Sequence, residues 1–187
     1  MYKVNPKLYA DYYKQPYRHF HNLKHLKYVY ESLKKHIDIS FRLEALIVCH
    51  DMVYYPGCSQ NEELSARRAR YLFPDIAEYL TQGILATKNH DLVNVSEEFK
   101  HEIALFLDAD MSILAADPST GFMSEYLLYQ GHIFLEFKEA GFTDEELKIG
   151  RLKFLNSFKG FITEEYKGLN ALAFRNIQQE IKGWQTE

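Results

Sequence analysis

The chain has 187 residues, of which 47% are hydrophobic, a length and composition typical of a single domain with one buried core. We therefore predict one domain over residues 1–187. Its 22 basic and 26 acidic residues are spread along the sequence and leave a net charge of -4, which argues against binding of a nucleic acid duplex or an anionic membrane. The N-terminus is polar, no run of about 18 apolar residues occurs, and there are only two cysteines, so we expect a cytoplasmic protein.

Helical periodicity dominates the first half of the chain. A short helix is expected over residues 5–14, and apolar residues recur at spacings of three and four over residues 20–36, as in an amphipathic helix. A third helix, over residues 41–55, is apolar on every side and is therefore expected at the centre of the fold. Ser59-Gln60-Asn61-Glu62 fits a capping box that opens a helix ending near Phe73.

The second half of the chain predicts five more helices. They span residues 75–87, a segment capped within 94–97 that continues to 114, residues 121–140, a capping box at 143–146 that continues to 159, and residues 168–184. In the first of these, the residues expected to point inward are Ile76, Tyr79, Leu80, Ile84 and Leu85. No segment alternates as a β-strand does, so the predicted fold class is all-α, a bundle of about seven to nine helices.

Histidines and aspartates on three of these helices have the chemistry of metal ligands. His21 and His25 lie one helical turn apart, and His50-Asp51 follows the apolar run of the central helix. Imidazole nitrogens and carboxylate oxygens together suit a divalent cation of borderline hardness. We predict a site of two nitrogens and two oxygens formed by His25, His50, Asp51 and Asp110.

Asp110 is included because of its place in an apolar stripe. The stripe has spacings of four, three and four and consists of Ile103, Leu107, Asp110 and Leu114. Burying a carboxylate there costs several kcal/mol unless it is paired or binds a cation. The competing interpretation is an ion pair with a buried arginine. Asp108 is the poorer candidate because it shares its helical face with the polar His101.

Five blocks of the sequence resemble a known family. They are RHFHNLKH (18–25), HDMVY (50–54), NEELSA (61–66), ATKNH (86–90) and LDADMSIL (107–114). In this order they resemble the HD-domain superfamily of metal-dependent phosphohydrolases, and more narrowly a bacterial subgroup of predicted metal-dependent HD phosphohydrolases. The resemblance extends from about Tyr17 to Asn176 and implies an HD-domain-like helical bundle.

The resemblance also implies roles for the two histidines of the first block. His-Asn-x-x-His is similar to a block of the cyclic-nucleotide phosphodiesterases, in which the second histidine binds metal and the first donates a proton. Carried over, His25 is a ligand and His21 protonates the leaving oxygen while metal-activated water attacks phosphorus. The chain departs from these relatives at Phe20, where a tyrosine is usual, and at Tyr54, which replaces a histidine and speaks against the cyclic-nucleotide reaction.

Four further residues of the blocks are candidates for the site. Arg18, Lys88 and His90 are expected to hold phosphate oxygens, with solvated cations and a helix cap as the competing interpretations. His90 is also a candidate ligand of a second metal. Glu62 is expected to act first in the capping box, and otherwise on water or a metal-bound group.

The expected activity is hydrolysis of a small phosphorylated compound, a nucleotide or a phosphomonoester. The alternatives are an HD-type di-iron oxygenase, which needs further histidine ligands, and a non-catalytic nucleotide-sensing module, which has no need of a proton donor. The ligand set accepts manganese, nickel, cobalt, iron, zinc or magnesium. The aromatic helix between Phe122 and Phe137 packs either internally or against a second copy in a homodimer.

Overall fold

The computed structural model describes residues 3–117 and 125–185, and within these ranges all regular structure is helical. The α-helices are α1 (Leu23–Leu33), α2 (Phe41–Cys49), α3 (Asn61–Leu72), α4 (Ala77–Thr87), α5 (Glu97–Met111), α6 (Glu125–Glu139), α7 (Asp144–Ser157), α8 (Glu164–Lys167) and α9 (Asn170–Gln185). Short 3-10 helices are η1 (Pro6–Leu8), η2 (Ala10–Tyr13), η3 (Pro74–Ile76) and η4 (Ser112–Ala115). The all-α prediction is confirmed. None of the described helices combines the length and the apolar character that a membrane crossing requires.

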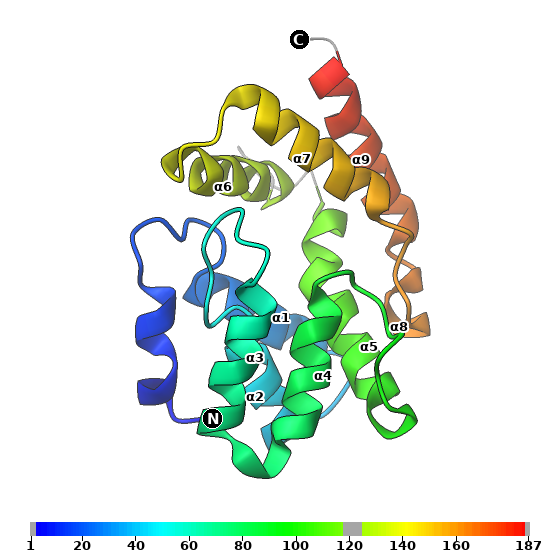
Figure 1. Ribbon diagram of the computed structural model, residues 1–187. Coiled ribbons are helices and arrows are strands. Elements are labelled where there is room, and N and C mark those ends of the chain that lie inside the picture. Colours follow the sequence, from blue (N-terminus) through cyan, green and yellow to red (C-terminus); the bar gives the residue numbers. More distant parts are fainter. Residues whose placement is uncertain (1–2, 118–124, 186–187) are drawn as a thin grey trace.

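Helix α2 is the centre of the fold, as its apolar sequence predicts. Every residue from Leu43 to Cys49 is buried, and the helix packs against α1, α3, α4 and α5. In Figure 1 these five helices form the lower part of the molecule, α6 and α7 lie above them, and α9 runs from the top of the picture down beside α5. Both α6 and α9 pack on η4, the short helix that continues α5. The two groups of helices therefore meet close to Asp110, in the last turn of α5.

The contact between α2 and α4 corrects one detail of the predicted core. Leu85 was expected to point inward but is 39% exposed. Gly83 occupies the buried position instead, and a Cβ atom there would lie 2.7 Å from Cδ1 of Leu46. The close approach of the two helices favours glycine at this point, because a larger side chain would displace the side chain of Leu46.

Several helix boundaries differ from the predicted ones. The segment 5–14 forms η1 and η2 rather than an α-helix, since so short a segment gains little from helical propensity alone. The capping box at 59–62 is wrong: Gln60 is the N-cap of α3, and no side chain caps it. Ser96, at the start of α5, also lacks a side-chain cap bond. The capping box of Thr143 and Glu146 is confirmed. Residues 121–124 of the predicted aromatic helix lie outside the described residues.

Helix α2 also ends earlier than predicted, at Cys49 rather than near Tyr55. The reason is local, because Nδ1 of His50 lies 2.8 Å from the carbonyl oxygen of Ile47. In a continued helix that oxygen would accept from the amide of Asp51. His50 therefore interrupts the helix and is itself held in place at its end.

Candidate metal centre

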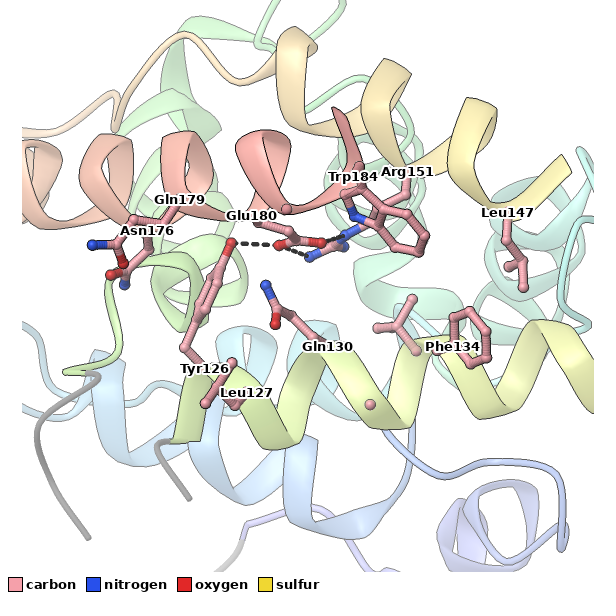
Figure 2. A pocket seen from close by; sticks show the side chains of 13 residues that line it. Tyr126, Leu127, Gln130, Phe134, Leu147, Arg151, Asn176, Gln179, Glu180 and Trp184 are labelled. Carbon is pink, nitrogen blue, oxygen red and sulfur yellow. Dashed lines mark hydrogen bonds and ion pairs between the residues drawn. The ribbon is translucent and has the colours of Figure 1, made fainter. Parts of the chain in front are cut away.

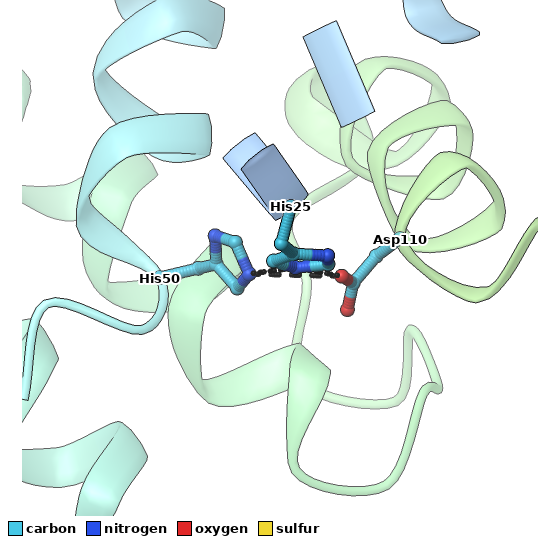
Figure 3. Close-up of side chains that lie close together, drawn as sticks. All are labelled: His25, His50 and Asp110. Carbon is cyan, nitrogen blue, oxygen red and sulfur yellow. Dashed lines mark hydrogen bonds and ion pairs between the residues drawn. The ribbon is translucent and has the colours of Figure 1, made fainter. Parts of the chain in front are cut away.

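Three predicted ligands from three helices meet at one point (Figure 3). His25 comes from the first turn of α1, His50 caps α2, and Asp110 comes from the last turn of α5. Nε2 of His25 lies 3.2 Å from Nε2 of His50 and 3.1 Å from Oδ1 of Asp110. One potential ligand atom from each residue lies within 4.8 Å of the others, so the three can share a cation.

Asp51 adds a second carboxylate to this cluster. Its Oδ2 atom lies 3.1 Å from Nε2 of His50 and 3.9 Å from Nε2 of His25. With metal–ligand bonds of about 2.1 Å, neighbouring ligand atoms at tetrahedral or octahedral corners lie about 3.0 to 3.4 Å apart. The three shortest separations fit such a cation, whereas the distances from His25 to Asp51 and from His50 to Asp110, 3.9 and 3.6 Å, are longer. His25, His50 and Asp110 are the set whose ligand atoms all lie within 4.8 Å of one another, and Asp51 lies at the edge of this set. The structure thus brings together His25, His50, Asp51 and Asp110 as predicted.

The orientation of His50 also suits a ligand. The carbonyl oxygen of Ile47 can only accept, so Nδ1 of His50 donates to it and the lone pair of the neutral ring is on Nε2, toward the cluster. Nδ1 of His25 is buried and has no hydrogen-bond partner among the described residues, which leaves its Nε2 as the engaged atom. Both imidazoles therefore present Nε2 to the same place.

The carboxylates and imidazoles of the cluster shift one another's pKa values. Burial lowers the pKa of His50, but the carboxylates of Asp51 and Asp110 more than reverse this and raise it to about 9. Burial raises the pKa of Asp51, and the neighbouring His50 overcomes this and brings it well below its usual range. The pKa of Asp110 is lowered in the same way, with His25 as the strongest opposing group. Without metal, the positive charge that balances the two carboxylates is a proton.

His21 lies beside this cluster and is bound to a carboxylate that sequence analysis missed. Its ring centroid is 5.9 Å from that of His25, and its Nδ1 lies 2.6 Å from Oε2 of Glu136, on α6. Glu136 is fully buried and also accepts from the amides of Phe20 and His21 and from the hydroxyl of Tyr54. Burial lowers the pKa of His21, but Glu136 outweighs it and the net shift is upward.

A sequence signal for Glu136 was present. Tyr126, Tyr129 and Ile133 form an apolar stripe at spacings of three and four, and Glu136 follows on the same stripe three residues later. That is the pattern that identified Asp110. Phe20 packs between the rings of His25, on α1, and Tyr129, on α6.

Arg18 is not placed to hold a phosphate group. It is buried, and its guanidinium donates to the backbone carbonyl oxygens of His21, Asp51 and Met52 at 3.0, 2.8 and 3.1 Å. The rings of Tyr13 and Tyr54 lie against the same group. Neither predicted role, phosphate ligand or solvated cation, fits this environment, and Arg18 instead fixes the backbone around two site residues.

Lys88 is exposed and Glu62 is half-buried, and the two side chains interact electrostatically. Nζ of Lys88 donates to Oε1 of Glu63 at 2.6 Å and to the carbonyl of Ser59 at 2.8 Å, so it links α4 to α3. Glu62 is half-buried, and its pKa is raised by burial, with a smaller contribution from the Asp51 carboxylate. Glu62 is therefore close enough to the cluster to interact with it, whereas Lys88 is engaged with α3.

His90 lies close to Asp110, whereas Asp108 binds another part of the chain. Nε2 of His90 lies 3.4 Å from Oδ2 of Asp110, the oxygen that His25 does not contact most closely, and His90 has a positive φ of 51°. Asp108 faces away from the centre and accepts from the amides of Ile162 and Thr163 and from the Thr163 hydroxyl. The preference for Asp110 over Asp108 agrees with this geometry, and the side chains found within ion-pair distance of Asp110 in the described part of the chain are histidines.

No family model matches the chain, and comparisons with curated proteins and with solved structures give no significant match. The HD-domain resemblance of the five blocks therefore stays a prediction, and the site must be judged by its chemistry.

Proposed function

We propose that the protein is a metal-dependent phosphohydrolase that acts on a small phosphorylated compound, a nucleotide or a phosphomonoester. One juxtaposition carries the proposal: an imidazole with a raised pKa, His21, beside a donor set of two imidazoles and two carboxylates. Phosphate ester hydrolysis needs a cation for the phosphoryl oxygens and the attacking water, and an acid for the leaving oxygen. The donor set would hold the cation, and His21 would act as the acid.

Metal binding and proton transfer are assigned to different residues. His25, His50, Asp51 and Asp110 would hold the cation, which when bound lowers the pKa of water and neutralises phosphoryl charge. Nδ1–H of His21 is committed to Glu136, so the proton that it can transfer is the one on Nε2. Because Glu136 favours the imidazolium, His21 keeps that proton until the leaving oxygen takes it.

The accessibility of the centre supports a small reacting group. The side chains of His25 and His50 are 2% and 1% exposed, whereas those of Asp51 and Asp110 are 20% and 13% exposed. The His21 side chain is also 20% exposed. Substrate would therefore approach over the two carboxylates and His21, and the rest of the cluster stays covered. The carboxylates repel a phosphate unless a cation is present, which makes the activity metal-dependent.

The proposal is tested by phosphate release from nucleotides, sugar phosphates and simple phosphomonoesters. Protein stripped by a chelator is reloaded with manganese, nickel, cobalt, iron, zinc or magnesium, and metal content is measured by mass spectrometry. We expect turnover only with metal. His21→Gln should keep the metal and lose rate, and His101→Gln, at an exposed histidine outside the site, is the matched control. Metal-loaded protein that releases no phosphate from any compound would refute the proposal.

One observation favours a second candidate, the HD-type di-iron oxygenase. His90 lies near Oδ2 of Asp110 while His25 lies near Oδ1, so the carboxylate can contact two ligand sets. An oxygenase would bind two iron ions for each chain and consume oxygen with a reduced substrate. A metal content of one ion per chain, with phosphate release, excludes it. The nucleotide-sensing alternative gains no support, because the His21–Glu136 pair has no use in a protein that only binds.

A further inference from the structure

A groove of about 520 Å³ lies between α6, α7 and α9 (Figure 2). This volume is in the range of pockets that bind small molecules. Thirteen residues line it, and none of the proposed metal ligands is among them. The groove is thus a separate feature of the molecule that the proposed reaction does not use.

The groove is amphipathic along its length. In Figure 2 the apolar side chains of Phe134, Leu147 and Trp184 gather at one end, and Asn176 lies at the other. The rings of Phe134 and Trp184 are nearly parallel, with centroids 6.5 Å apart. Asn176 and Trp184 are eight residues apart on α9, about 12 Å along the helix axis. A ligand that fits both ends has an apolar body and a polar end.

The base of the groove is polar but carries no net charge. Arg151 pairs with Glu180 through two hydrogen bonds of 2.7 and 3.0 Å and donates to the hydroxyl of Tyr129 at 2.8 Å. Glu180 also accepts from the hydroxyl of Tyr126. With its charges paired in this way, the groove offers neither a cation nor an anion to a ligand, so an uncharged ligand is favoured.

The side chain of Asn176 brings a buried hydrogen-bond acceptor to the groove. Asn176 is 1% exposed, and its amide group donates to the carbonyl oxygens of Leu114 and Ala116. Its Oδ1 atom has no hydrogen-bond partner in the part of the chain that the structure describes. Such an atom is costly in a folded protein unless a ligand or water donates to it. A ligand's polar end is therefore expected to carry a hydrogen-bond donor.

Gly131 leaves part of the lining of the groove without a side chain. It lies in the middle of α6 and lines the groove, and a Cβ atom there would meet no described atom within 4 Å. Packing within the described chain therefore does not require glycine, although glycine destabilises a helix interior relative to alanine. Because Gly131 is part of the lining, a large side chain at this position is expected to take up space in the groove.

We propose that this groove is a second binding site, for an uncharged small molecule with an aromatic or aliphatic body and a hydrogen-bond donor. The probe for its test is the uncharged fluorophore N-phenyl-1-naphthylamine. Trp184 is the single tryptophan of the sequence, so its emission reports on the groove directly. We expect saturable quenching of Trp184 with one probe bound per chain and energy transfer to the probe.

Two variants make the test specific. Gly131→Phe should fill the groove and weaken probe binding by about tenfold or more. Gly150→Phe, in α7 and outside the groove, is the matched control, because a Cβ there also meets nothing within 4 Å, and it should keep the affinity. Amide chemical shifts of the unaltered protein provide a second measurement, and probe-induced changes should gather on α6, α7 and α9.

Three results would overturn the proposal. One is quenching that does not saturate. Another is unchanged affinity in Gly131→Phe, or shift changes that are spread over the molecule when that variant does not fold. The third is a dimer of the unaltered protein in sedimentation that Gly131→Phe converts to a monomer, because a second copy would then occupy the groove.

Discussion

Replacing Glu136 by glutamine removes the buried charge that supports His21 and leaves every proposed metal ligand in place. Each carboxylate oxygen of Glu136 accepts two hydrogen bonds, at 2.7 and 2.9 Å on Oε1 and at 2.6 and 2.7 Å on Oε2. Glutamine offers one acceptor oxygen, so two of the four donors lose their partner. At about 1.5 to 3 kcal/mol for each bond to a charged group, Glu136→Gln should lower the free energy of unfolding by about 3 to 6 kcal/mol.

The effect on catalysis is distinguishable from this loss of stability. Without Glu136 the pKa of His21 falls, so less of the imidazolium is present, and general acid catalysis is worth about 10² to 10⁴ in rate. An alkyl phosphate needs the acid because its leaving group is poor, whereas p-nitrophenyl phosphate hardly does. The ratio of the two kcat values, measured in one preparation, does not depend on the folded fraction. It should fall about 10²-fold or more.

An unchanged ratio would refute the reasoning, whatever happens to the absolute rates. Tyr54→Phe provides a graded comparison, because it removes one of the four donors to Glu136 and leaves the carboxylate charged. Its ratio should stay near that of the unaltered protein. Metal content, which rests on other residues, should be the same in both variants.

Three further outcomes are expected. Asp51→Ala should lose both bound metal and turnover, since it removes an anionic ligand, and metal analysis of the purified variant checks this. Metal affinity should fall about tenfold for each pH unit below about 9, because the raised pKa of His50 means that a proton must leave before Nε2 can bind a cation; titrations over a pH series would contradict this if the affinity were constant. Asp108→Ala should lower stability in urea by about 3 kcal/mol or more, because three donors of Ile162 and Thr163 lose their acceptor, while kcat of the folded protein stays unchanged.

The sequence predicts those parts of the site that follow from helical periodicity. A carboxylate in an apolar stripe identified Asp110. The same rule applied to α6 would have identified Glu136, but its many aromatic residues pointed to packing alone. The spacing of four that put His21 and His25 on one helix was wrong for His21, because α1 begins only at Leu23 and His21 precedes its N-cap, Asn22. His21 and Glu136 are 115 residues apart, so no local pattern joins them.

Other features depend on tertiary contacts that periodicity does not describe. In the sequence Arg18 resembles any cation near a motif, and only the fold shows that its donors are used by the carbonyl oxygens of three later residues, two of them more than 30 positions away. The exposed Leu85 and the buried Gly83 are exchanged relative to the helical pattern because α2 approaches α4 closely. The end of a helix also depends on side chains that bind its backbone carbonyl oxygens, as His50 binds that of Ile47 at the end of α2.

The proposed metal binding and the proposed support of the acid His21 are two properties that depend on different helices. All four proposed metal ligands belong to the bundle formed by α1 to α5, whereas the carboxylate that supports the acid comes from the group of helices above it. Divergent evolution can therefore alter one property without the other. A substitution of Glu136 would remove the support of His21 and leave all four proposed ligands in place, by a change outside every segment that contributes a proposed metal ligand.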